Sequence, residues 1–168
     1  MELSQPTIFL SSANINIISA SGNDALVGGE GNETLNGGAD NSVSIGGLGA
    51  NILTVGLGAD CFDFNLIIES VGTSIDTIAD FSDLQLDYID LSTIDTKSGS
   101  AIINVAFTFI GNNITFSNIA GQLRFDTASG ILSGDIDGNG AADFEIQLAG
   151  VTPSLLVTNF YFVSSNLM

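Results

Sequence analysis

Five consecutive nine-residue segments decide the fold: SASGNDALV (19–27), GGEGNETLN (28–36), GGADNSVSI (37–45), GGLGANILT (46–54) and VGLGADCFD (55–63). They follow one another without an insertion and contain 11 of the 20 glycines. Glycine recurs at the first, second and fourth positions. The eighth position reads Leu26, Leu35, Ser44, Leu53 and Phe62. A glycine turn followed by a short strand with one inward apolar residue predicts a stack of parallel strands, a β-roll.

The sequence on either side of these repeats has a different character. The preceding nonamer, LSSANINII (10–18), keeps an apolar eighth residue but lacks glycine, and we interpret residues 1–18 as an N-terminal cap. Over residues 64–168, β-branched and aromatic runs alternate with turn signals and show no sustained helical period. DTASG (126–130) is typical of a hairpin turn between two such runs. The sequence predicts an all-β chain in which a short parallel β-roll (19–63) continues into an antiparallel β-sandwich (64–168).

Charge and composition exclude several classes of function. The 168 residues carry 19 acidic side chains and a net charge of −17, with Lys97 and Arg124 as the only basic residues, so nucleic acid is not an expected partner. No run of apolar residues is long enough for a membrane-spanning helix, and no cleavable N-terminal secretion signal is visible. The absence of histidine excludes histidine-dependent catalysis and histidine-ligated zinc. Asp-rich acidity instead favours Ca²⁺, although an acidic surface that only confers solubility explains the charge equally well.

The sixth positions of the nonamers are candidate calcium ligands. Two nonamers complete one coil, so turns on one edge of the roll recur every 18 residues, and glycine lets their carbonyl oxygens crowd around a cation. The expected stacks are Asp24, Ser42 and Asp60 on one edge, and Glu33 and Asn51 on the other. Each stacked pair retains a single carboxylate. We therefore expect weak sites, or a roll that stands on packing and backbone hydrogen bonds alone.

A second candidate calcium site is DIDGNGAAD (135–143), which fits the pattern DxDxNGxxD. Side-chain oxygens of Asp135, Asp137, Asn139 and Asp143 and the backbone carbonyl of Ala141 would form an oxygen-ligand loop. The flanks are predicted strands, and Ile146 occupies the position where an EF-hand needs glutamate. The alternative is a carboxylate-rich turn without metal. We expect the tightest Ca²⁺ site in this loop, because three carboxylates converge within nine residues.

Several motifs together resemble the C-terminal domain of serralysin-type secreted metalloproteases. The nonamers are similar to the RTX calcium-binding repeat GGxGxDxUx, where U is a large apolar residue. DTIADF (76–81), DYIDLS (87–92) and LRFDTASGILSGDIDGNGAADFEIQLAG (123–150) are similar to later segments of that domain. The resemblance covers about residues 19–163. The sequence departs from the family in its eroded repeats and in a loop that is one residue longer and lacks the expected glycine between Phe81 and Asp87.

This resemblance implies a function without catalysis. In serralysins the catalytic zinc lies on an HExxH helix of a separate N-terminal domain, and this chain has no such motif. The C-terminal domain folds on Ca²⁺ outside the cell and carries an uncleaved signal for type I export. Residues 159–163, NFYFV, are similar to the end of that signal, with Asn159 in place of the usual aspartate. The expected partners are calcium ions and a type I secretion transporter, and the expected location is extracellular.

Two other functions compete with this interpretation. The first is a stand-alone extracellular structural or adhesion protein, whose copies would associate through strand edges of the β-roll. The second is an enzyme such as a glycosidase with paired aspartates, which the metal-loop spacing of the carboxylates and the absence of tryptophan disfavour. The single cysteine, Cys61, allows no intramolecular disulfide and is expected to be a small buried residue.

Overall fold

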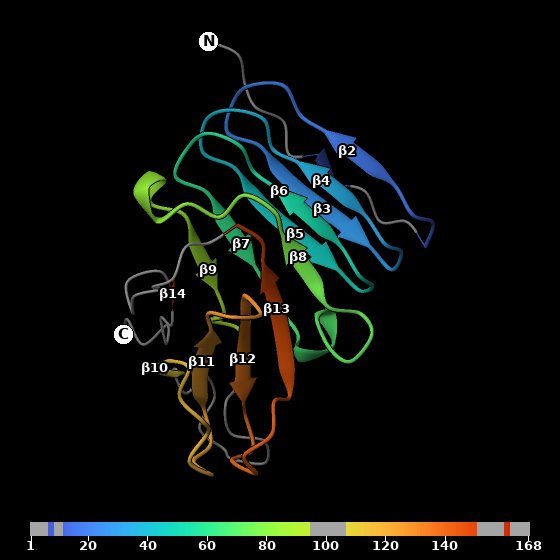
Figure 1. Cartoon of the computed structure of the whole chain (residues 1–168). Coiled ribbons are helices and arrows are strands. Elements are labelled where there is room, and N and C mark those ends of the chain that lie inside the picture. The colour runs from blue at the N-terminus through green and yellow to red at the C-terminus, as the bar shows by residue number, and fades with distance from the viewer. Residues whose placement is uncertain (1–6, 9–11, 95–106, 151–159, 162–168) are drawn as a thin grey trace, which may run out of the picture.

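The computed structural model describes residues 7–8, 12–94, 107–150 and 160–161, which form an all-β molecule built on two sheets (Figure 1). The six-stranded sheet, sheet A, has the order β1-β3-β5-β7-β9-β14. The eight-stranded sheet, sheet B, has the order β10-β11-β12-β13-β8-β6-β4-β2. The predicted all-β fold class is confirmed, and so is the parallel β-roll at its start.

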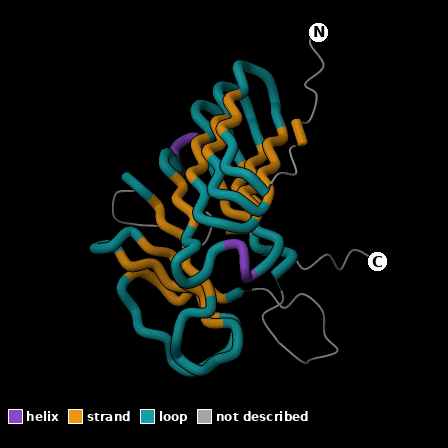
Figure 2. The backbone as a smooth tube through the Cα atoms, turned by 90° about the vertical axis from the view of Figure 1, so that its right-hand side faces the viewer, coloured by secondary structure: helices purple, strands orange, loops and turns teal. Residues whose placement is uncertain are grey.

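The roll forms because successive short strands alternate between the two sheets. In sheet B lie β2 (Asn16–Ile18), β4 (Thr34–Asn36) and β6 (Ile52–Thr54), and in sheet A lie β3 (Ala25–Gly29), β5 (Val43–Gly47) and β7 (Cys61–Asp63). Neighbours in each sheet pair in parallel with a register of 18 residues, as in Leu35 with Leu53. Figure 2 shows the strands as successive rungs of one stack. The glycine turns between them close each half-coil.

The core fills the space between the two sheets. Leu26, Leu35, Leu53 and Phe62, the apolar eighth positions of the repeats, are at most 1% exposed and belong to one hydrophobic cluster. Ser44 occupies the remaining eighth position, and its hydroxyl is buried without a hydrogen-bond partner. The inward positions predicted from the nine-residue period are therefore the buried ones.

The coil does not stop at residue 63, where the repeats end. After the 3₁₀ helix η1 (Ile67–Glu69), β8 (Asp76–Ile78) pairs in parallel with β6 in sheet B. After the 3₁₀ helix η2 (Asp83–Gln85), β9 (Tyr88–Asp90) pairs in parallel with β7 in sheet A. The sheets thus cross the expected division at residues 63 and 64. At the other end β2, inside the expected cap, pairs with β4 as a regular rung, and β1 (Thr7–Ile8) pairs with β3.

The C-terminal part is mixed, which corrects the expected antiparallel sandwich. β11 (Gln122–Asp126), β12 (Ile131–Asp135) and β13 (Phe144–Leu148) are antiparallel neighbours, and the predicted turn 126–130 joins the first two. β10 (Thr108–Asn112) pairs in parallel with β11, β13 with β8, and β14 (Phe160–Tyr161) with β9. The β13–β8 and β14–β9 pairs join these last strands to both sheets of the coil. They share one core with it.

The expected export signal at 159–163 lies outside the described residues except for β14. The backbone of β14 extends sheet A next to β9. Within the described part of the chain, no helix has the length and apolar character needed to cross a membrane.

Candidate metal centre

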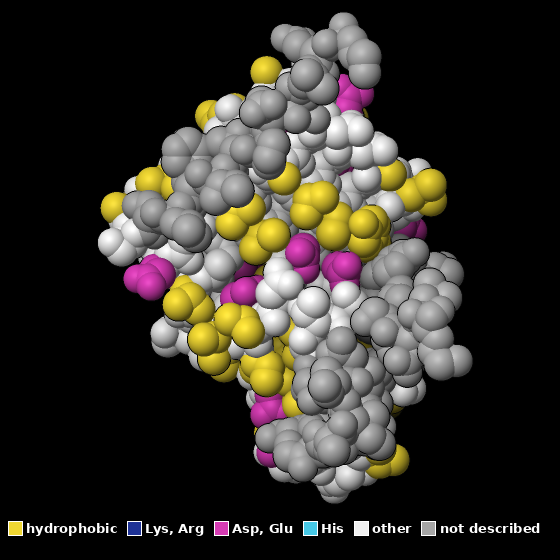
Figure 3. Space-filling view, turned by 180° about the vertical axis from the view of Figure 1, so that it is seen from behind, with side chains coloured by type: hydrophobic (Ala, Val, Ile, Leu, Met, Phe, Trp, Pro, Cys, Tyr) yellow, Lys and Arg dark blue, Asp and Glu magenta, His cyan; other side chains and the backbone are white. Residues whose placement is uncertain are grey.

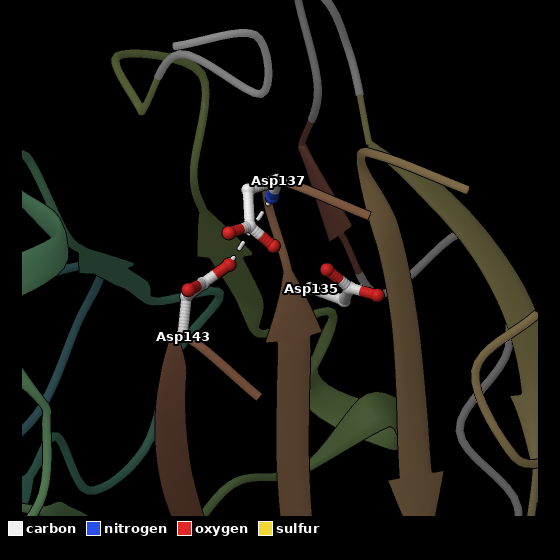
Figure 4. Close-up of side chains that lie close together, drawn as sticks. All are labelled: Asp135, Asp137 and Asp143. Atoms are coloured by element: carbon white, nitrogen blue, oxygen red, sulfur yellow. Dashed lines mark hydrogen bonds between the residues drawn. The ribbon is translucent and has the colours of Figure 1, made fainter. Parts of the chain in front are cut away.

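The predicted loop at 135–143 brings its three aspartates together. Asp135 is the last residue of β12 and is fully buried, Asp143 directly precedes β13 and is half-buried, and Asp137 is exposed between them. Their ligand oxygens lie within 4.8 Å of one another, and Figure 4 shows the three side chains around one turn. Among the described residues this is the one group of three or more acidic, histidine or cysteine side chains close enough to share a cation.

Backbone hydrogen bonds orient these carboxylates. The two oxygens of Asp135 accept the N–H groups of Gly138 at 2.7 Å and Gly140 at 2.9 Å, and both glycines have positive φ, +78° and +85°. Oδ2 of Asp143 accepts the N–H groups of Ile136 at 2.6 Å and Asp137 at 3.2 Å. The turn therefore fixes the negatively charged groups through its own backbone.

The other two predicted ligands, Asn139 and Ala141, lie at the exposed tip of the loop. Oδ1 of Asn139 accepts the N–H of Ala141 at 2.7 Å, and the Asn139 amide donates to Asp137 Oδ2 at 3.0 Å. These contacts form a chain of short side-chain-to-backbone turns. Such turns hold a loop of this sequence in shape with or without a cation.

The predicted stack on one edge of the roll is present as a hydrogen-bond ladder. The N–H of Asp24 donates to Ser42 Oγ at 3.4 Å, and the N–H of Ser42 donates to Asp60 Oδ1 at 2.6 Å. The N–H of Asp60 donates in turn to Asp87 Oδ1 at 3.1 Å. Each of these acceptor side chains thus accepts a backbone N–H group from the preceding coil. Asp24 itself also accepts the Ser19 hydroxyl.

The other edge carries the same kind of ladder with a more buried set of acids. The N–H of Glu33 donates to Asn51 Oδ1 at 2.8 Å, and the N–H of Asn51 donates to Asp76 Oδ1 at 2.8 Å. Glu33, Asn51 and Asp76 are each at most 1% exposed. Glu33 Oε1 and Asp76 Oδ2, like Asp60 Oδ2 on the first edge, are buried oxygens without a hydrogen-bond partner.

A second ladder, which sequence reasoning missed, is formed by asparagines at the fifth position. Oδ1 of Asn23 accepts the N–H of Asn41 at 3.1 Å, and Oδ1 of Asn41 accepts the N–H of Ala59 at 2.9 Å. Oδ1 of Asn14 and Oδ1 of Asn32 act in the same way on the other edge. The signal was visible, because asparagine recurs every nine residues from Asn14 to Asn41.

Burial raises the pKa of several carboxyls along these edges. The pKa of Asp76 rises to about 8, mainly because burial disfavours its charge, and the nearby Glu69 and Glu33 add repulsion. The pKa of Asp87 rises to about 6 for the same main reason, with Asp60 and Asp80 as acidic neighbours. Burial also raises the pKa of Asp60 and of Glu69. Each of these carboxyls is therefore easier to protonate than an ordinary aspartate or glutamate.

Sequence reasoning also missed the roles of Asp76, Asp80 and Asp87. Asp80 accepts the N–H groups of Val55 at 3.1 Å and Gly56 at 2.7 Å, and so closes the last glycine turn. The chain separation between donor and acceptor is 24 to 27 residues at this end of the roll, instead of 18. The 18-residue repeat spacing therefore does not predict these carboxylates as acceptors of backbone N–H groups.

Comparisons with known proteins agree with this architecture. The profile of the family described as peptidase M10 serralysin C terminal matches residues 8–160. The solution structure of the AlgE6R3 subunit from the Azotobacter vinelandii mannuronan C5-epimerase is similar, with a TM-score of 0.66 and 25% sequence identity over 99% of this chain and 88% of that chain. No curated protein sequence matches the chain.

Proposed function

The chain belongs to the peptidase M10 serralysin C-terminal family, and on that premise we propose that it is a secreted, non-catalytic calcium-binding domain that serves export and extracellular folding. The observation that carries this proposal is the convergence of Asp135, Asp137 and Asp143 within 4.8 Å. Their oxygens are the donor type that Ca²⁺ prefers, and three carboxylates supply enough charge for a tight site.

The residues of the 135–143 loop fit a calcium ion. Asp135, Asp137 and Asp143 would supply carboxylate oxygens, Asn139 its amide oxygen and Ala141 its backbone carbonyl. The local turn already orients the carboxylates, so binding requires little additional ordering of the chain. A bound cation would also offset the mutual repulsion of three closely spaced negative charges.

The edges of the roll are the second set of proposed sites. Asp24 and Asp60 would act on one edge, and Glu33 and Asn51 on the other. Support comes from the buried, unpartnered oxygens Asp60 Oδ2 and Glu33 Oε1, because a cation would stabilise their ionised form. On each edge, at least one side-chain oxygen already accepts a backbone N–H group. Each predicted pair also has only one carboxylate. We therefore expect Ca²⁺ to bind more weakly here than in the loop.

The proposed export and folding role depends on Ca²⁺ binding that offsets the repulsion between the chain's negative charges. The chain has a net charge of −17, and self-repulsion of this size destabilises a compact state until cations bind. Outside a cell, where Ca²⁺ is plentiful, binding would favour the folded domain. A type I transporter is the proposed route, on the resemblance of residues 159–163 to the family's export signal.

Calorimetric titration with Ca²⁺ of the chain and of two variants tests the proposal. Asp137→Ala removes one exposed loop carboxylate and should abolish the tightest site. Asp83→Asn removes an exposed carboxylate in η2, far from the loop in sequence, and should leave that site unchanged. Equal Ca²⁺ affinity in the wild type and Asp137→Ala would reject the loop as the site. A chain that binds no Ca²⁺ at all would reject the function.

A structural role through self-association is a second candidate, and the edge strand β2 favours it. β2 ends sheet B, and its Ile18 is 70% exposed. Such an edge offers backbone groups and apolar surface to another copy. Sedimentation of the chain with Ca²⁺ should then show concentration-dependent oligomers that Ile18→Lys prevents, whereas monomers at all concentrations would exclude this role.

A further inference from the structure

A hollow that the calcium sites do not use lies beside sheet A. It has a volume of about 580 Å³, within the range of ligand-binding pockets, and we call it the apolar groove. Its apolar lining comes from β3, β5, the turn after β5 and the segment around η1: Val27, Ile45, Leu48, Leu66 and Ile68. Leu66 is 56% and Ile68 58% exposed, so its outer wall presents apolar surface to solvent.

Glycines of the stacked coils form part of the groove lining. They are Gly28, Gly29 and Gly47. A Cβ at Gly28 would collide with the carbonyl oxygen of Gly46, and one at Gly47 would collide with that of Gly29. Gly47 also has a φ of +83°. The coils therefore stack too closely at Gly28 and Gly47 to admit a side chain at either position.

The ionisable side chains in the described lining of the groove are both acidic. They are Glu30, which is exposed, and Glu69, which is 5% exposed and accepts the N–H of Asn65 at 2.9 Å. The described basic residue, Arg124, belongs to β11 and lies over the ring of Phe116, 4.7 Å from its centre. Figure 3 shows one face of the molecule, where apolar side chains lie beside carboxylates and no basic side chain is visible.

We propose that the apolar groove binds a cationic, amphipathic peptide segment of another protein, a function beyond calcium binding and export. Apolar side chains of the peptide would enter between Ile45, Leu66 and Ile68, and its lysine or arginine side chains would face the exposed Glu30. Charge decides against the other occupants. A second copy would bring a net charge of −17 to an acidic rim, and an anionic lipid surface would be repelled likewise. None of the described lining residues is an aromatic side chain of the kind that stacks on sugars.

An eight-residue peptide of alternating lysine and leucine, labelled for fluorescence anisotropy, is a suitable probe. The titration uses the whole chain in Ca²⁺-containing buffer, so that filled metal sites do not attract the lysines. Leu66→Ser removes apolar groove surface and should weaken binding about tenfold. Glu30→Gln removes one rim charge and should weaken it about threefold. Leu84→Ser, at a leucine that is 91% exposed and outside the groove, and Asp83→Asn are the matched controls and should change nothing.

A peptide of alternating lysine and serine separates groove binding from attraction to an acidic protein. It carries the same charge and should bind at least about tenfold more weakly than the leucine peptide. Equal binding of the two peptides, or equal effects of Leu66→Ser and Leu84→Ser, would overturn the proposal. This result is independent of the calcium titration, because a chain without a tight Ca²⁺ site could still bind the peptide.

Discussion

At the scale of single residues, buried carboxyls with an oxygen left unpaired in the described part of the chain distinguish this protein from an ordinary acidic one. Asp76 and Asp60 are fully buried, and each has one oxygen without a hydrogen-bond partner. Their other oxygens accept backbone N–H groups of neighbouring coils. One group therefore has two roles: its hydrogen bond supports the roll, and its charge, once ionised, opposes folding unless a proton or a cation is bound.

Asp76 should make the calcium-free domain less stable as pH rises. Its pKa is about 8 in the folded chain against 3.8 for the ordinary group, so the folded state holds its proton more tightly than the unfolded state. Its contribution favours folding at low pH and is lost between these two values as pH rises. Asp76→Asn should raise the free energy of unfolding at pH 8 in chelator by an amount on the order of a few kcal/mol. Urea unfolding across pH measures this.

Asp83→Asn is the control for Asp76→Asn, because Asp83 is exposed and its replacement removes a charge without removing a buried carboxyl. It should leave the slope of stability against pH nearly unchanged. If Asp76→Asn keeps the wild-type slope between pH 4 and 8, burial of this carboxyl does not set the pH dependence of the free energy of unfolding.

At the scale of elements, close stacking of glycine turns holds the coils together. Gly56 has a φ of +89°, and a Cβ there would collide with the carbonyl oxygen of Gly38 in the coil below. Gly72 has a comparable φ of +65° but no atom within 4 Å of its would-be Cβ. Gly56→Ala should lower the free energy of unfolding by more than about 2 kcal/mol, and Gly72→Ala by about 1 kcal/mol. Equal losses in urea unfolding would show that stacking adds nothing.

The roll should stay folded without calcium, because its edges are held by side-chain ladders and its interior by apolar residues. Asn41 and Asp60 accept backbone N–H groups of the turns, so these groups are hydrogen-bonded without calcium. Hydrogen exchange in chelator should show protected amides in β3 to β7. Rapid exchange throughout 19–63 in chelator, with protection restored by Ca²⁺, would show that packing and ladders are insufficient.

The sequence predicted these elements as far as strict periodicity extended. The nine-residue register placed the inward leucines and stacked Asp24 over Ser42 and Asp60. Beyond Asp63 two irregular loops with 3₁₀ helices lengthen the coil, so β8 and β9 could not be assigned to the roll by spacing. The loop at 135–143 was found because its ligands are local in sequence. The apolar groove was not, because it depends on where the segment around η1 packs against β5.

At the scale of the whole molecule, a net charge of −17 is combined with one continuous apolar core. The core favours the compact state, and the repulsion of 19 acidic side chains opposes it. Calcium that binds only the folded chain would stabilise it by mass action. Calcium should therefore raise the stability of the intact domain, whichever sites contribute.

Thermal unfolding of the intact chain at a series of Ca²⁺ concentrations, with chelator and Mg²⁺ as references, tests this central claim most directly. We expect Tm to rise continuously with the logarithm of the Ca²⁺ concentration once this concentration exceeds the Kd of the loop site. Mg²⁺ at equal ionic strength should have a much smaller effect on Tm. A Tm that is the same in Ca²⁺, Mg²⁺ and chelator would contradict this claim.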